Sequence, residues 1–267
     1  MHCPQTMNRQ LWEKEAREGK KECERGEYLS GLFREALNRG ITHLVPAPRR
    51  WSLLKTDLWN EGVDSRKDVL GHYAGGGFSL YGVDIAADVI RAVAEPSIRS
   101  AQAALGALPF KRGSFDMLLD LSTLDHIPHA ASAGVIADYR RILKKDGVLV
   151  MAVDSWGFFW RLYYLYQRRL RRMEVGVFPG TDIPNQYRYQ PKALCSLLTK
   201  QGFAVCEEYC IDWFGWSWNR LTLRMWRHLM RHHYRGLIRW EYSRWSKYMK
   251  AFAKQYVIIA RNQEGGE

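Results

Sequence analysis

The most regular feature of the chain is an alternation of short apolar runs with stretches whose apolar residues recur at helical spacing. Near-continuous apolar runs suit strands covered on both faces, and strands separated by helices pair in parallel. The predicted strands span 51–56, 78–85, 98–105, 115–121, 148–153, 203–211 and 256–260. The predicted helices span 65–74, 129–144 and 191–202, and one more ends at residue 94. The pattern therefore predicts an α/β fold with a seven-stranded, mostly parallel sheet and helices on both faces.

The part of the chain before this alternation has a different pattern. Apolar residues at helical spacing predict a helix over 8–39, with Gly40 as its stop. We therefore expect an N-terminal helical segment, residues 1–45, followed by one domain, residues 46–267. This division also fits the length of the chain and its ordinary share of apolar residues, 46%.

Two insertions interrupt the predicted domain, at 156–190 and 213–250. The second is helical in pattern and holds six tryptophans, seven arginines and two lysines against a single acid, Glu241. It thus contributes +8 of the net charge of +12. A basic and aromatic segment suits a lid over an apolar substrate or an anionic membrane surface. RNA contact through arginine and stacked aromatics is the weaker alternative, because no RNA-binding module is visible.

A glycine triplet, Gly75–Gly77, invites a reading as a nucleotide loop. Such a loop lies between the first strand and the first helix, and an acid follows it by about 20 residues. Here the strand-terminal acid, Asp84, follows by only seven to nine residues. The triplet is better explained as a turn into the second strand, and the first loop is then 56–62.

Asp84 itself has two interpretations. An acid at the end of the second strand of a parallel sheet can accept hydrogen bonds from both hydroxyls of a ribose. An acid just before a helix can equally be an N-cap. The spacing alone supports both.

Several segments together resemble the class I methyltransferases, which have a Rossmann-like fold and use S-adenosylmethionine. They are Gly82–Ile85, Ala107–Phe110 with Ser114–Leu119, Leu124–Pro128 and Tyr139–Leu149. They occur in the order and at the spacing of that family. The resemblance implies S-adenosylmethionine as the cofactor and methyl transfer as the reaction.

The resemblance also implies a set of cofactor-binding residues. The first loop lacks the family's usual glycines and looks like a minority variant that reads Lys-Thr-Asp-Leu before an aromatic residue. Asp57 or Glu61 would pair with the methionine ammonium, and the backbone near Ala104 and Leu105 would hold the adenine. The implied set is Lys55, Asp57, Glu61, Asp84, Ile85, Ala104, Leu105, Asp120 and Leu121. A domain that kept the fold and lost the cofactor is the alternative.

Polar residues after the fourth predicted strand are the candidates for acceptor chemistry. His126 has an ordinary pKa near neutrality and could deprotonate an acceptor with Asp125 beside it. The alternative is a purely structural role in the loop, which the position favours. We expect a hydrophobic or lipid-like acceptor, with an RNA acceptor as the competing hypothesis.

Five scattered cysteines without a Cys-x-x-Cys pair indicate a reduced setting and no zinc site. No apolar run is long enough for a spanning helix, and the first residues lack the pattern of a secretory signal. We therefore expect a cytoplasmic protein without a bound metal, associated at most peripherally with a membrane.

Overall fold

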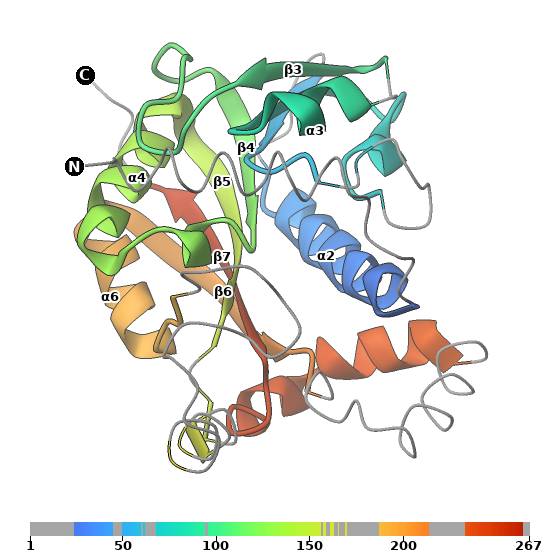
Figure 1. The fold of residues 1–267 in the computed structure, drawn as a ribbon, viewed down its shortest axis with the longest axis vertical. Helices are drawn as coiled ribbons and strands as arrows, with labels where there is room; N and C mark the ends of the chain where they lie inside the picture. Colours follow the sequence, from blue (N-terminus) through green and yellow to red (C-terminus); the bar gives the residue numbers. More distant parts are fainter. Residues whose placement is uncertain are drawn as a thin grey trace.

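The computed structural model forms a single seven-stranded sheet with helices on both faces (Figure 1). It describes residues 24–44, 50–59, 61, 68–93, 96–155, 157–158, 161–162, 165, 169, 187–213 and 233–263. The strands are β1 (Trp51–Lys55), β2 (Phe78–Asp84), β3 (Ile98–Gln102), β4 (Phe115–Leu121), β5 (Leu143–Asp154), β6 (Phe203–Ile211) and β7 (Gln255–Asn262). The helices are α2 (Glu24–Thr42), α3 (Ala87–Ala92), α4 (His129–Ile142) and α6 (Pro191–Lys200).

The strand order is β3-β2-β1-β4-β5-β7-β6. Strands β1 to β5 are parallel, whereas β7 runs antiparallel to both β5 and β6, between which it lies. The chain builds outward from β1 to β3, then returns to the other side of β1 to form β4. Strand order thus reverses between β1 and β4, and such a switch point is where open α/β sheets bind ligands, at the carboxyl ends of the strands.

Each face of the sheet has its own hydrophobic core. On one face, α2 and α3 cover the sheet, and Leu32 and Leu37 of α2 are completely buried. On the other face, α4 packs against β5 and α6 against β6, with Tyr139 completely buried. Burial on both faces explains why the strands read as near-continuous apolar runs.

The structure corrects some predicted boundaries. Helix α2 continues past Gly40 to Thr42. A Cβ atom at Gly40 would lie 2.4 Å from Cγ2 of Val150, so this glycine lets the helix approach the sheet closely and does not end it. Strand β5 begins at Leu143, five residues before the predicted strand 148–153. Its pairing with β4 has a register shift between Phe115 and Met117, which accommodates the extra residues. The predicted helix 8–39 falls outside the described residues before residue 24.

The region before β2 is also less helical than expected. In place of a helix over 65–74, the described part contains only a short 3-10 helix, η1 (Gly71–Tyr73); residues 62–67 lie outside the description. The glycine triplet forms the turn from η1 into β2, as predicted, and Gly75 and Gly77 have φ values of 80° and 82°. The amide of Trp51 donates to the carbonyl of Gly77, which places this turn at the amino ends of the strands, away from the switch point.

Candidate functional site

Polar groups gather at the carboxyl ends of β1 and β2, beside the switch point. The loop after β1 is held against the neighbouring strands by two contacts. The amide of Thr56 donates to the carbonyl of Leu119 in β4 (3.0 Å), and Leu58 inserts its side chain over Gly82 of β2. Leu58 is almost completely buried, and a Cβ atom at Gly82 would be 2.2 Å from its Cδ2. The loop therefore has an apolar anchor in place of a glycine-rich turn.

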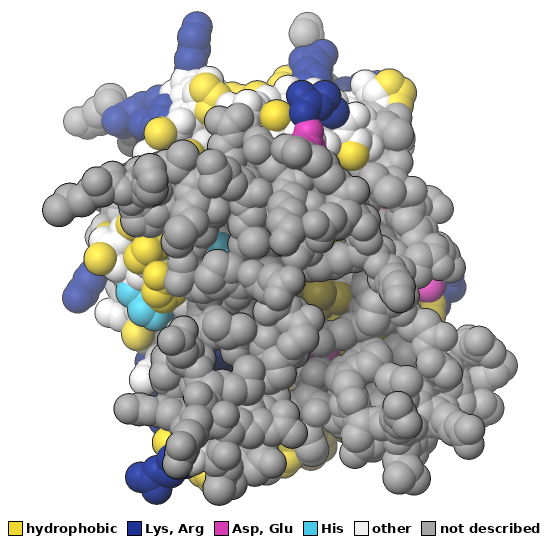
Figure 2. Space-filling view, viewed as in Figure 1, with side chains coloured by type: hydrophobic (Ala, Val, Ile, Leu, Met, Phe, Trp, Pro, Cys, Tyr) yellow, Lys and Arg dark blue, Asp and Glu magenta, His cyan; other side chains and the backbone are white. Residues whose placement is uncertain are grey.

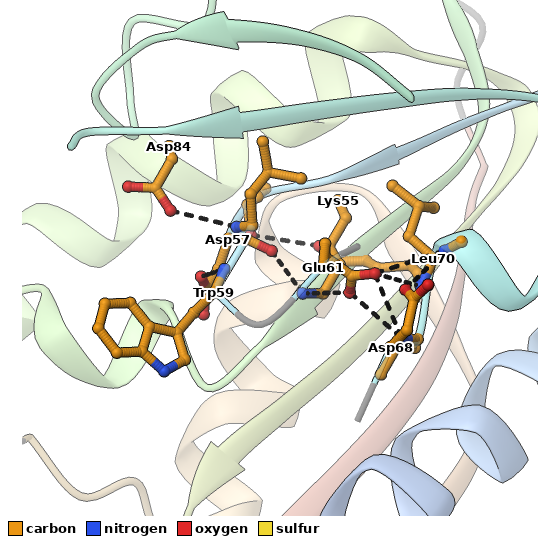
Figure 3. Close-up of polar contacts among 12 residues, drawn as sticks. Lys55, Asp57, Trp59, Glu61, Asp68, Leu70 and Asp84 are labelled. Carbon is orange, nitrogen blue, oxygen red and sulfur yellow. Dashed lines mark hydrogen bonds and ion pairs between the residues drawn. The ribbon is translucent and has the colours of Figure 1, made fainter. Parts of the chain in front are cut away.

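A buried ion pair between Lys55 and Glu61 also holds the loop after β1 (Figure 3). Nζ of Lys55, the last residue of β1, lies 2.7 Å from Oε1 of Glu61, and the side chains are 5% and 0% exposed. Glu61 also accepts hydrogen bonds from the amides of Leu70 (2.8 Å) and Val69 (3.2 Å). The pair thus ties the end of β1 to the chain entering η1. Its attraction lowers the pKa of Glu61 and raises that of Lys55, in each case against the opposing effect of burial.

Asp84 is buried at the end of β2 and faces the loop after β1 (Figure 3). Its Oδ2 accepts from the amide of Leu58 (3.1 Å) and its Oδ1 from that of Ala86 (2.8 Å). Burial, and then the nearby Asp57 carboxylate, raise the pKa of Asp84 to about 7. Asp84 is not the N-cap of α3, because that position is Ala86 and no side chain caps the helix. Each carboxylate oxygen of Asp84 retains a second lone pair for a ligand.

A second polar group lies at the ends of β4 and β5. Asp125 is completely buried, and His126 Nε2 lies 3.9 Å from its Oδ1. Arg188 is largely buried nearby; its Nη2 is 3.5 Å from Oδ2 of Asp154, the last residue of β5. Burial lowers the pKa of Arg188, and the carboxylates of Asp154 and Asp125 oppose that shift. The carboxylates of Asp154 and Asp125 thus both interact with the largely buried guanidinium of Arg188.

The deciding observation is a match in sequence. Residues 68–151 match the family model of the methyltransferase domain. Over this range the chain is similar to the methyltransferase domain, and S-adenosylmethionine-dependent methyl transfer is the activity that the match supports. The matched range runs from the segment before β2 to β5 and includes Asp84, Asp125 and His126.

Solved structures show that this chain shares the fold of the family over nearly its whole length. Magnesium protoporphyrin IX methyltransferase from Synechocystis PCC 6803, solved with bound S-adenosylhomocysteine, is 12% identical at a TM-score of 0.58. That comparison covers 96% of this chain and 99% of the other. A Haloferax volcanii methyltransferase in complex with the Trm112 activator is 12% identical at 0.57, covering 97% and 99%. A Methanosarcina mazei methyltransferase is 18% identical at 0.53, covering 83% and 96%. No match was found among curated protein sequences.

The residues beside the switch point fit S-adenosylmethionine, which combines a ribose with a cationic sulfonium and an ammonium group. Asp57 and Asp84 bring two carboxylates to adjacent strand ends. Asp57 keeps its side chain partly exposed, and its Oδ1 accepts from the amide of Trp59 (2.7 Å). Glu61, the other acid proposed for the ammonium group, already pairs with Lys55 and accepts hydrogen bonds from the amides of residues 69 and 70. The geometry therefore favours Asp57 over Glu61 as the ammonium partner.

The other predicted cofactor residues separate into two groups. Ile85, Ala104 and Leu105 are partly exposed at the ends of β2 and β3, where they can contact a ligand. Leu121 is buried in the core, and Asp120 is completely buried. Asp120 does not face the cofactor edge as we expected. Its Oδ1 accepts from the amides of residues 123 and 124 and its Oδ2 from the Tyr139 hydroxyl, so its role is to fix the turn after β4.

Sequence reasoning missed three features of the site: the Leu58 anchor, the Lys55–Glu61 pair and the polar group around Asp154 and Arg188. Asp154 directly follows the predicted strand 148–153, and an acid at the end of a strand is the signal that singled out Asp84, so it could have pointed to Asp154 as well. Arg188 lies near the end of the insertion 156–190 and carries no local pattern. Within the described residues, no cluster of three or more His, Cys, Asp or Glu side chains could hold a metal ion.

Proposed function

We propose that this protein transfers the methyl group of S-adenosylmethionine to a hydrophobic or lipid-like small molecule at a membrane surface. When bound, the cofactor supplies an electrophilic methyl group. In our proposal Asp84 holds its ribose and Asp57 its ammonium group. His126, with Asp125 beside it, takes the proton of the acceptor. Most of the remaining work is positioning, since methyl transfer needs little more than an in-line approach.

The observation that carries the proposed acceptor class is an exposed apolar and basic surface beyond the ends of β5 and β6. The helical residues Phe158, Leu162 and Leu165 follow β5 at a spacing that places them on one side of a helix, and they are 57%, 47% and 46% exposed. Arg161 and Arg169 are exposed beside them. Large apolar side chains exposed in a row, next to arginines, are typical of interfacial helices.

The second part of this surface comes from the basic aromatic insertion. Trp245 and Tyr248 of η3 (Arg244–Tyr248) are 53% and 67% exposed. Arg244 lies 5.7 Å from the Trp245 ring and Lys247 lies 5.1 Å from the Tyr248 ring. Such pairs can place an aromatic ring at the level of lipid headgroups and a cation against their phosphates.

The two parts meet beyond the sheet. A Cβ atom at Gly157 would lie 3.0 Å from the carbonyl oxygen of Lys250, so the chain after β5 touches the chain after η3. Hydrophobic side chains occur beside Lys or Arg at the end of the molecule where these segments lie, at the bottom of the view (Figures 1 and 2). Among the described residues, no helix has the length and apolar character needed to cross a bilayer. Surface contact is therefore the mode that we propose.

Vesicle binding tests the proposed surface. We expect the protein to float with vesicles of phosphatidylcholine and phosphatidylglycerol, and to be released by salt. Each basic residue near the headgroups contributes about 1 kcal/mol, so Arg244→Glu with Lys247→Glu should weaken binding at least thirtyfold. Lys111→Glu with Lys200→Glu makes the same charge change at exposed positions elsewhere and should have a much smaller effect. Residues 214–232, with most of the arginines of the insertion, lie outside the description.

Two further outcomes decide between the alternatives. Salt-sensitive binding to RNA without vesicle binding would move the acceptor from lipid to RNA. A calorimetric titration with S-adenosylmethionine tests the cofactor separately. No binding by the folded protein would favour a domain that kept the fold and lost the cofactor.

A further inference from the structure

Two buried side chains stand directly opposite each other at the ends of β5 and β7. Asp154 and Gln255 are partners in the antiparallel register, so their side chains lie on the same face of the sheet. That face is the one covered by α2, because Ala152 and Val257, two residues away on each strand, belong to its core. Asp154 and Gln255 are 1% and 2% exposed.

The hydrogen bonds of this pair are incomplete. Gln255 Nε2 donates to Oγ of Ser122 (2.8 Å), but its Oε1 has no hydrogen-bond partner. Oδ2 of Asp154 also has none, because Nη2 of Arg188 is 3.5 Å away, too far for a good charge-assisted bond. Buried polar atoms in native proteins are almost always satisfied, so each unsatisfied one needs an explanation.

The two orphaned atoms have the same chemistry. A carboxylate oxygen and an amide oxygen are hydrogen-bond acceptors only, so the group that completes the site must bring donors. Asp154 is a carboxylate, so a donor that also carries a positive charge, such as an ammonium group, complements it better than a neutral one.

We propose that Asp154 and Gln255 form a subsite that recognises an amino group of the methyl acceptor. This inference rests on the proposed function, because the acceptor is placed by it beyond the ends of β4 and β5. Ser122, the partner of Gln255, directly follows β4 and has a φ of 63°, so the turn there aims its hydroxyl at the amide. The subsite identifies the acceptor as an apolar molecule with an amine; it does not assign the atom that is methylated.

Three probes of equal chain length distinguish the chemistry. Decylamine, decanol and decanoate are titrated calorimetrically into the protein, with and without S-adenosylhomocysteine. We expect decylamine to bind most tightly and decanoate least, because a carboxylate has no proton to donate and is repelled by Asp154. Preferred binding of decanoate would show that Arg188 governs the site and would overturn the proposal.

The variant Gln255→Met removes both polar atoms of the amide at nearly constant volume. It should weaken decylamine binding about tenfold, weaken decanol binding less, and leave S-adenosylhomocysteine binding unchanged. Gln201→Met, at the far end of α6, is the matched control and should change nothing. The variant Asp154→Asn is a second test. We expect it to bind decylamine no more tightly than decanol, because the negative charge is removed.

The outcomes separate the two proposals. Unchanged decylamine affinity in a folded Gln255→Met variant would mean that a buried water completes the pair, and the subsite would be refuted. Gln255-dependent binding of decylamine by a protein that binds no S-adenosylhomocysteine would support the subsite and refute the proposed methyl transfer.

Discussion

The ion pair between Lys55 and Glu61 gives a sharp test of how the first loop is held. The change Glu61→Gln keeps one oxygen that can accept from the amides of Val69 and Leu70 but removes the charge. At 2.7 Å and an effective dielectric constant of 20, the gross attraction between the two charges is about 6 kcal/mol. In the variant the Lys55 ammonium would remain buried without its counter-charge. Breaking a buried pair in this way typically costs about 3–5 kcal/mol of stability.

Deprotonation of Lys55 sets an upper limit on that cost. An ordinary lysine has a pKa of about 10.4, and removing its proton at pH 7 costs about 4.6 kcal/mol. We therefore expect urea unfolding to show a loss of about 3–4.6 kcal/mol in Glu61→Gln. The folded variant should bind fewer protons than its unfolded state, so its stability should rise between pH 7 and 9. Lys55→Met with Glu61→Gln should recover much of the loss, because no charge is left buried.

A matched control is the partly exposed pair of Arg39 and Glu35, 3.0 Å apart on α2. Glu35→Gln should cost less than about 1 kcal/mol, as for other surface pairs. A loss below that value in Glu61→Gln, without any rise of stability toward pH 9, would refute the reasoning. The wild-type protein should show no such rise, because the pKa of its Lys55 is raised in the folded state.

Three further changes probe the neighbouring groups. Asp84→Ala should lose about 1.5–3 kcal/mol of S-adenosylhomocysteine binding in calorimetry, and wild-type affinity should rise from pH 6 to 8 as the carboxyl with a pKa of about 7 ionises. Gly82→Ala should cost about 1–3 kcal/mol in urea unfolding by displacing Leu58, whereas Gly134→Ala, in open space on α4, should not destabilise the protein. Burial and the neighbouring carboxyl of Glu61 raise the pKa of Asp68 to about 7. The contribution of Asp68 to the stability of the protein is therefore complete below about pH 4 and is lost as the pH rises through 7. The variant Asp68→Asn should flatten this pH dependence of the urea midpoint.

The sequence predicted the sheet well because its signal is local. Strands β4 and β6 begin and end at the predicted residues, since each is a mainly apolar run between polar turns. Asp84 was predicted to lie at the end of β2 for the same reason. The position of the glycine triplet followed from counting residues between it and that acid.

The contacts that complete the site were not predictable in this way. Glu61 bonds to the backbone of residues 69–71, and Leu58 fills the space above Gly82, 24 residues further along the chain. Asp154 and Gln255 meet across 101 residues because β7 returns beside β5. Such pairings depend on strand order, and no periodicity in the sequence encodes them.

The place of β7 in the sheet also has a consequence for how the protein is made. Strand β7 lies between β5 and β6, yet β5 leaves the ribosome about one hundred residues earlier. Until β7 emerges, the facing sides of β5 and β6 have no partner, and unpaired strand edges readily join other chains. During synthesis there is therefore a stage at which β5 and β6 are complete but β7, which pairs with both, has not yet been made. We expect the nascent protein to be most prone to aggregation at that stage, which the synthesis of the aromatic insertion before β7 prolongs.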